Sequence, residues 1–152
     1  MRRILTWALV TAVLATTAAV AQTFSGPSSP ALARIYFYRG VETNRATPWT
    51  RVFINGQMIG ALGERSYFFR DVQPGTYKIT VSTDLPYQDQ TITVAPNTTA
   101  FVRVFLVPEY GVQVSQTGQG FAPQIYEPNV FGNRVMDPGR AQREMAGLAP
   151  AS

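Results

Sequence analysis

Between residues 33 and 117, apolar and polar residues alternate in short runs, which is the pattern of β-strands that bury one face. In the clearest run, Tyr77, Ile79 and Val81 are expected to face inward, because polar residues separate them. Residues 34–39 carry apolar groups on both faces, which is typical of a strand in the middle of a packed structure. The predicted strands, about seven in number, span residues 34–39, 50–54, 57–62, 66–72, 76–82, 91–94 and 100–107.

Turn residues separate these runs. Asn55-Gly56 predicts a tight hairpin, because both residues tolerate positive φ. Pro74-Gly75 predicts another turn, in which proline restricts φ and glycine accepts a left-handed conformation. Short strands between such turns predict an all-β fold. We expect a small antiparallel β-sandwich domain over residues 33–117, followed by an irregular tail with a short helix.

The tail comprises residues 118–152. Its first part is rich in Gly and Pro, yet it carries several large apolar residues, namely Phe121, Ile125, Tyr126, Val130 and Phe131. We expect this part to cover Phe101 and Phe105, because two phenylalanines on the outer face of a strand would otherwise be exposed. An Asp-Pro pair then predicts the start of a helix over residues 138–146, docked beside this cover.

Residues 1–21 have the pattern of a secretory signal peptide: two arginines, an uncharged apolar stretch, and the small residues Ala19 and Ala21. Cleavage is expected between Ala21 and Gln22, which leaves no stable membrane span. Residues 22–32 are rich in Ser, Gly and Pro, and this composition predicts a linker. We therefore expect a periplasmic or extracellular bacterial protein.

Several segments resemble the DUF2846 family of bacterial domains of unknown function, and the pattern is also similar to PEGA-type domains. The segments are ARIYFYR at 33–39, VFINGQMIG at 52–60, YF at 67–68, PGTY at 74–77 and TITV at 91–94. The resemblance implies a small β-sandwich, and several such domains are attached to the bacterial envelope as lipoproteins. This chain departs from that last feature, because it has no cysteine to accept a lipid. The resemblance implies no catalytic residue.

The chain contains no histidine and no cysteine, which excludes Ser-His-Asp and Cys-His nucleophile systems. The usual zinc, copper and haem ligands are missing for the same reason. We therefore predict that the protein is not an enzyme and has no cofactor and no metal site. Its basic residues are scattered singly, so no nucleic-acid-binding track is expected.

Three kinds of binding or catalysis stay open. Asp84 and Asp89 could act as the paired carboxylates of a carbohydrate-active enzyme. Trp49, Tyr87 and Tyr110 are candidate aromatic contacts for a sugar. A protein-binding module could instead add a partner's strand to a free, uncharged sheet edge.

The interpretation that we adopt is an exported, envelope-associated β-sandwich with a binding or scaffolding role and no catalysis. Its partner would be an envelope protein or a glycan. The alternative is a carbohydrate-binding or carbohydrate-active protein that uses the Asp84 and Asp89 loop together with exposed aromatic residues.

Overall fold

The computed structural model describes residues 24–41, 49–82, 89–107 and 130–151, together with the backbone of two strands at 111–117 and 120–126. The predicted signal peptide, with Ala19, Ala21 and Gln22, lies outside the described residues, and so do Asp84, Tyr87 and Tyr110. Within the described part, no helix is long and apolar enough to cross a membrane.

The described residues form eleven strands and one helix. The elements are β1 (Ala33–Arg39), β2 (Thr50–Ile54), β3 (Gln57–Leu62), β4 (Ser66–Val72), β5 (Gly75–Val81), β6 (Gln90–Val94), β7 (Thr99–Val107), β8 (Gly111–Thr117), β9 (Gly120–Tyr126), β10 (Val130–Met136), α1 (Pro138–Met145) and β11 (Ala149–Pro150). The first seven strands match the predicted ones to within one residue at each end.

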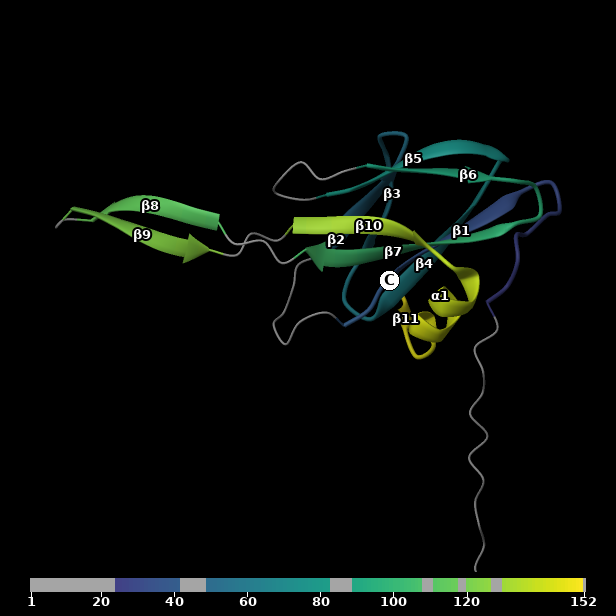
Figure 1. The fold of residues 1–152 in the computed structure, drawn as a ribbon. Helices are drawn as coiled ribbons and strands as arrows, with labels where there is room; N and C mark the ends of the chain where they lie inside the picture. Colours follow the sequence, from purple (N-terminus) through teal and green to yellow (C-terminus); the bar gives the residue numbers. More distant parts are fainter. Residues whose placement is uncertain are drawn as a thin grey trace, which may run out of the picture.

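Two sheets pack face to face (Figure 1), which confirms the all-β sandwich with a short C-terminal helix. One sheet has five strands in the order β10-β7-β1-β4-β11, and the other has four in the order β3-β2-β5-β6. Apolar residues from both sheets fill the space between them, including Phe37, Val52, Ile79 and Val104. This inter-sheet core is the main hydrophobic cluster of the domain.

β1 lies in the middle of its sheet and is buried on both faces, as its apolar pattern predicted. It runs antiparallel to β4 but parallel to β7, with Arg34 opposite Thr99 and Tyr38 opposite Arg103. The sandwich is therefore mixed rather than purely antiparallel. The alternation within one strand specifies which residues are buried but not the direction of its neighbours, so this pairing could not be predicted.

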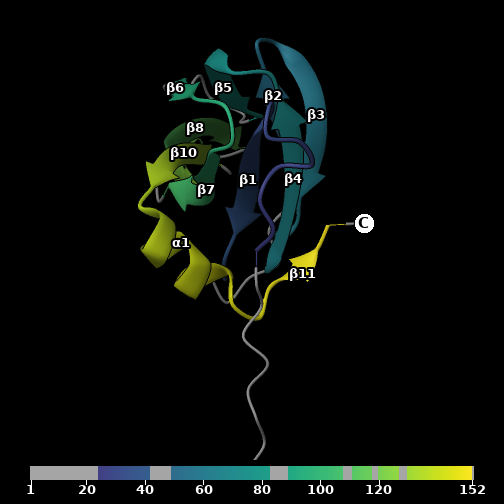
Figure 2. The same cartoon turned by 90° about the vertical axis from the view of Figure 1, so that its right-hand side faces the viewer.

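The outer face of the five-stranded sheet is covered by α1, which lies against it in Figure 2. Tyr36, Phe101 and Met145 are almost fully buried in this second cluster, and Phe24 packs at its border. The expectation that helix 138–146 docks near Phe101 is therefore met. Phe24 belongs to the segment expected to be a linker, and it contributes its ring to the domain.

The one residue of the expected cover whose side chain is described lies elsewhere; the side chains of Phe121, Ile125, Tyr126 and Val130 lie outside the described part of the structure. Phe131 does not lie over Phe101 and Phe105; it is 2% exposed and packs in the inter-sheet core. The reason is that β10 pairs with β7 as an extra strand, with Phe131 opposite Leu106, so both face the core. β8 and β9 pair as a hairpin that lies outside the sandwich in Figure 1. The tail thus contains regular strands rather than an irregular segment.

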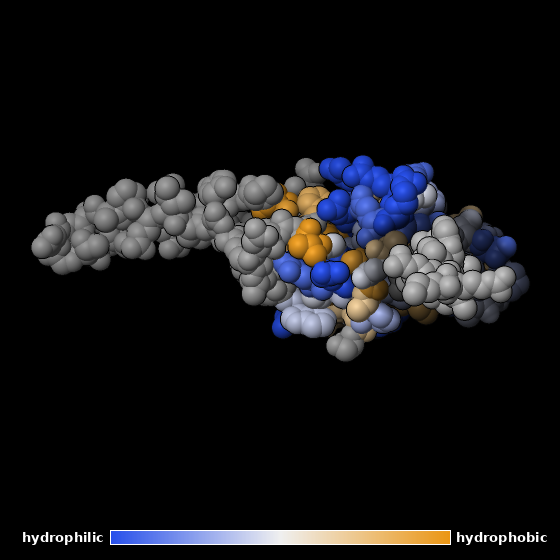
Figure 3. Space-filling model, turned by 90° about the horizontal axis from the view of Figure 1, so that it is seen from below, coloured by the Kyte–Doolittle hydropathy of each residue, from blue (hydrophilic) through white to orange (hydrophobic). Residues whose placement is uncertain are grey.

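The large hydrophobic residues that are exposed are scattered along the described chain and do not share one strand or helix, namely Val41, Trp49, Met58, Phe69 and Val135. On the face seen in Figure 3, hydrophobic side chains form small patches among hydrophilic ones. Scattered exposed residues of this kind are normal for a folded domain and do not by themselves mark an interface.

Candidate binding groove

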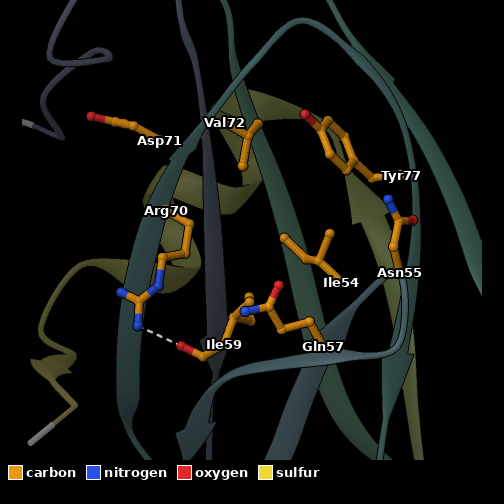
Figure 4. A pocket seen from close by; sticks show the side chains of 8 residues that line it. All are labelled: Ile54, Asn55, Gln57, Ile59, Arg70, Asp71, Val72 and Tyr77. Carbon is orange, nitrogen blue, oxygen red and sulfur yellow. Dashed lines mark hydrogen bonds between the residues drawn. The ribbon is translucent and has the colours of Figure 1, made fainter.

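A groove of about 340 Å³ lies between the β2–β3 hairpin and the adjoining parts of β4 and β5 (Figure 4). Its lining residues are Ile54, Asn55, Gln57, Ile59, Arg70, Asp71, Val72 and Tyr77. A volume of this size falls at the lower end of the range for small-molecule sites. The groove is therefore large enough for a short segment of a polymer or for a small ligand.

The floor of the groove is apolar. Ile54 belongs to the inter-sheet core, and Ile59, Val72 and Tyr77 pack against that core while remaining partly exposed. The hydroxyl of Tyr77 donates a 2.6 Å hydrogen bond to the carbonyl of Gln73, which orients the ring. A ligand that covered this floor would bury apolar surface, which favours binding.

The hairpin wall is held by its turn. Asn55 and Gly56 adopt φ values of 49° and 80°, the left-handed conformation that a tight hairpin requires. The Asn55 side-chain oxygen accepts a 2.8 Å hydrogen bond from the backbone N–H of Lys78, and the Asn55 N–H donates to the Lys78 carbonyl. The turn predicted from sequence is present, and these bonds attach it to β5.

The opposite wall carries Arg70. Its guanidinium donates a 3.0 Å hydrogen bond to the carbonyl of Phe69 on β4 and a second hydrogen bond to the carbonyl of Ile59 on β3. The same group lies over the ring of Phe68, 5.3 Å from its centroid. Arg70 therefore bridges the edges of the two sheets, as the dashed line in Figure 4 shows.

Asp71 points away from the groove in Figure 4. Its carboxylate accepts hydrogen bonds from two guanidinium nitrogens of Arg34, at 2.7 and 2.9 Å, and from the backbone N–H of Ser28. The hydrogen bond from Arg34 holds the pKa of Asp71 well below its usual range. Asp71 is therefore a fixed negative charge at neutral pH and a poor proton donor.

The free edge of β4 is partly occupied by the chain itself. The N–H of Ala149 donates to the carbonyl of Arg65 at 3.0 Å, and the N–H of Ala151 donates to the carbonyl of Tyr67 at 2.7 Å. β11 thus adds to β4 as a short parallel strand. It ends before the part of β4 that borders the groove.

Of the aromatic and acidic residues chosen from sequence, the structure describes Trp49 and Asp89, and neither lines this groove. Trp49 is 56% exposed and lies before β2, at the opposite end of that strand from the hairpin. A Cβ atom on Gly63 would come within 3.3 Å of the Trp49 ring, so the indole packs over this glycine. Its predicted sugar contact stays a prediction.

Asp89 binds the side chains of Lys78 and Thr80 on the neighbouring strand. The hydrogen bond from Lys78, followed by that from Thr80, lowers the pKa of Asp89. A carboxyl with a lowered pKa is ionised at neutral pH, which does not suit the general acid of a glycosidase. This arrangement is that of a polar strand contact.

Sequence reasoning missed Arg70 and Ile59 as groove residues. The sequence feature that could have indicated Arg70 is that it interrupts the aromatic and apolar strand at residues 66–72. A charged residue on a strand is one way in which proteins protect a sheet edge. Its position at an edge depends on the order of strands, which the local pattern does not specify.

A second polar cluster lies at the other end of the sandwich. Arg39 is fully buried, lies over the ring of Phe131 and approaches Glu64 to 4.0 Å. The side-chain amide atoms of Asn133 and the hydroxyl of Thr50 are buried and have no hydrogen-bond partner in the described part of the chain.

Comparison with known families identifies one match. Residues 30–119 match the profile of DUF2846, described as a protein of unknown function. No curated protein and no solved structure matches the chain significantly. The matched segment contains β1 to β8 and every residue that lines the groove.

Proposed function

This chain belongs to the DUF2846 family, and we propose that its domain is a non-catalytic binding module of the bacterial cell envelope that holds its ligand in the groove between β3 and β4. The observation that carries this proposal is the groove itself. It combines an apolar floor, a hairpin wall fixed by hydrogen bonds and a rim of polar side chains. Binding sites commonly have this composition.

The absence of histidine and cysteine from the sequence supports a role without catalysis. The carboxylates of Asp71 and Asp89 both have lowered pKa values, because Arg34 donates a hydrogen bond to Asp71 and Lys78 donates one to Asp89. Neither is a suitable general acid at neutral pH. An envelope location is supported by the signal-peptide pattern of residues 1–21.

A glycan is the second candidate ligand class. The observation that favours it is that the ring of Tyr77 lines the same groove as the side-chain amides of Asn55 and Gln57. An aromatic face and planar amides together can stack on a sugar and hydrogen-bond its hydroxyl groups. A glycan could be bound in this way by residues of the groove alone.

Nuclear magnetic resonance of the isotope-labelled protein tests the proposal. Titration with a pool of end-blocked pentapeptides, and separately with soluble peptidoglycan fragments, should shift the amide signals of Gln57, Ile59 and Val72. Gln57→Arg places a long cation at the groove and should abolish these shifts. Gln90→Arg introduces the same residue on β6, outside the groove, and should leave them unchanged. Binding by neither probe, or binding that Gln57→Arg does not affect, would overturn the proposed site.

A further inference from the structure

We propose that the ligand of the groove is an extended polypeptide strand of a partner protein, which adds to the edge of β4 in line with β11 and displaces the guanidinium of Arg70. This inference rests on the proposed function, since it names the ligand class of the same groove. It follows from the hydrogen bonds along one strand edge.

The chain itself shows how a strand binds to this edge. The carbonyl of Arg65, just before β4, and that of Tyr67, within β4, accept hydrogen bonds from the N–H groups of Ala149 and Ala151. Backbone groups that face one side of a strand recur at every second residue. The next acceptor on this edge therefore belongs to Phe69.

The carbonyl of Phe69 accepts a hydrogen bond from Arg70 rather than from a backbone N–H. The guanidinium occupies the position at which the following residue of an added strand would donate. Its second hydrogen bond, to the carbonyl of Ile59, covers the facing edge of β3 in the same way. Arg70 thus ends the ladder that β11 begins, and an incoming strand must replace both hydrogen bonds.

The side-chain environment also suits a strand. Ala151 already packs against the inter-sheet core from its position beside β4. Alternate side chains of a strand that continued in this direction would face the same way, toward Ile59 and Val72. The remaining side chains would face water. We therefore expect the ligand to have small or medium apolar residues at alternate positions, with the backbone supplying most of the affinity.

A polypeptide fits these observations better than a glycan. A sugar can accept hydrogen bonds from Arg70, but it has no regular row of donors at the spacing of strand residues. The carbonyls of Arg65 and Tyr67 already accept hydrogen bonds from peptide N–H groups. The edge is therefore adapted to peptide backbone, and the glycan is the alternative outcome of the experiment.

The test compares Arg70→Met with the wild-type protein in titrations with the same pool of end-blocked pentapeptides. Methionine supplies an unbranched apolar side chain but removes every donor, together with the guanidinium that lies over Phe68, so the two carbonyls become available. We expect the Kd for bound peptides to fall at least about fivefold, because the strand no longer competes with charge-assisted hydrogen bonds. Arg70→Lys should lie between the two, since lysine is a single point donor on a flexible chain.

The matched control is Arg51→Met, which removes an exposed arginine from β2 without changing the groove lining. Peptide affinity should not change in this variant. Hydrogen exchange supplies the second measurement: peptide binding should slow exchange at the amide of Asp71, the next outward-facing group after Phe69. Peptides with proline at the central positions lack the donors and should bind at least tenfold more weakly.

The outcomes are distinguishable. If peptidoglycan fragments bind in the groove and peptides do not, the strand inference is wrong and the binding function stands. If peptides bind with the same affinity to Arg70→Met and Arg51→Met and do not protect Asp71, the ligand is a peptide but β4 is not its docking edge, and the inference is again wrong. If neither probe binds, the proposed function fails as well.

Discussion

The hydroxyl of Tyr38 on β1 donates a 2.8 Å hydrogen bond to a carboxylate oxygen of Glu144 on α1, 106 positions later in the chain. The same carboxylate binds Arg140 at 2.7 Å and Arg103 at 3.5 Å. Although burial raises the pKa of Glu144, the hydrogen bonds from Arg140 and Tyr38 lower it overall. Burial, followed by the hydrogen bond to Glu144, raises the pKa of Tyr38 well above its usual range. This contact fixes the position of the helix on the sheet.

Removing this hydrogen bond should weaken helix docking. We expect Tyr38→Phe to lower the free energy of unfolding by about 1–2 kcal/mol, because a buried hydrogen bond to a charged group is lost. Tyr67→Phe is the control, since no hydrogen bond of its hydroxyl is found in the described part of the chain, and it should change stability by less than about 0.5 kcal/mol. Urea denaturation of both variants measures the difference. Equal stabilities would show that the Tyr38 contact does not hold the helix.

The Asn55-Gly56 turn should be sensitive to substitution. Gly56 has φ of 80°, and a β-branched residue resists this conformation. Gly56→Val should destabilise the domain by about 1–3 kcal/mol, a cost caused by backbone strain because a Cβ at this position meets no neighbour. Gly40→Val is the control, because Gly40 also has open space around it but no positive φ. An unchanged melting temperature for Gly56→Val would contradict the turn assignment.

The ion pair of Asp71 and Arg34 should make stability depend on acid pH. Because the hydrogen bond from Arg34 lowers the pKa of folded Asp71, the contribution of the pair is complete above the pKa of an unfolded aspartate, about 4. It is lost as the pH falls through the lower pKa of the folded state. Asp71→Asn should therefore be less stable than wild type at pH 7, and the difference should narrow as the pH falls below about 4.

Thermal unfolding at a series of pH values measures this effect. Asp137→Asn is the control, because asparagine retains the helix-capping hydrogen bond to the N–H of Arg140 while removing an exposed carboxylate. At pH 7 it should lose less stability than Asp71→Asn, because the capping hydrogen bond is kept. A constant difference between Asp71→Asn and wild type down to pH 2 would contradict a lowered pKa.

The precursor should be cleaved after Ala21. The basic start, the apolar stretch and the small residues at positions 19 and 21 favour this site. N-terminal sequencing of protein from the envelope fraction should begin at Gln22. Ala19→Arg should block cleavage, because signal peptidase accepts only small residues there, whereas Ala18→Arg tests whether any charge nearby has the same effect. An intact Met1 on the envelope protein would refute the prediction.

Much of the fold could be predicted from sequence because its determinants are local. The Asn-Gly pair specified one hairpin, and alternation placed Ile79 and Val81 in the core, where both are buried. An Asp-Pro pair specified the start of α1, and Asp137 does cap it, with its carboxylate accepting the N–H of Arg140. Each of these features depends on residues within a few positions of one another.

The groove could not be predicted in the same way. Ile59 and Arg70 meet because β3 and β4 lie at neighbouring edges of two sheets, and this depends on the order of strands. The position of Phe131 could not be predicted for the same reason. Its side chain is hydrophobic, but it lies in the core only because β10 pairs with β7. Pairing between distant strands leaves no short sequence pattern, so composition alone favoured an irregular tail.

The central position of β1 also affects how the protein folds. β1 is synthesised before the other strands, and β4 pairs with one of its edges. The other edge stays unpaired until β7 binds to it, and β7 is synthesised after all four strands of the opposite sheet. Long-range pairing of this kind closes a large loop before the contacts stabilise it, so we expect folding on the order of milliseconds to seconds rather than microseconds. During that interval both apolar faces of β1 are uncovered and prone to aggregation. Pairing of β7 with β1 is therefore the step that ends the period in which the folding chain is most exposed to aggregation.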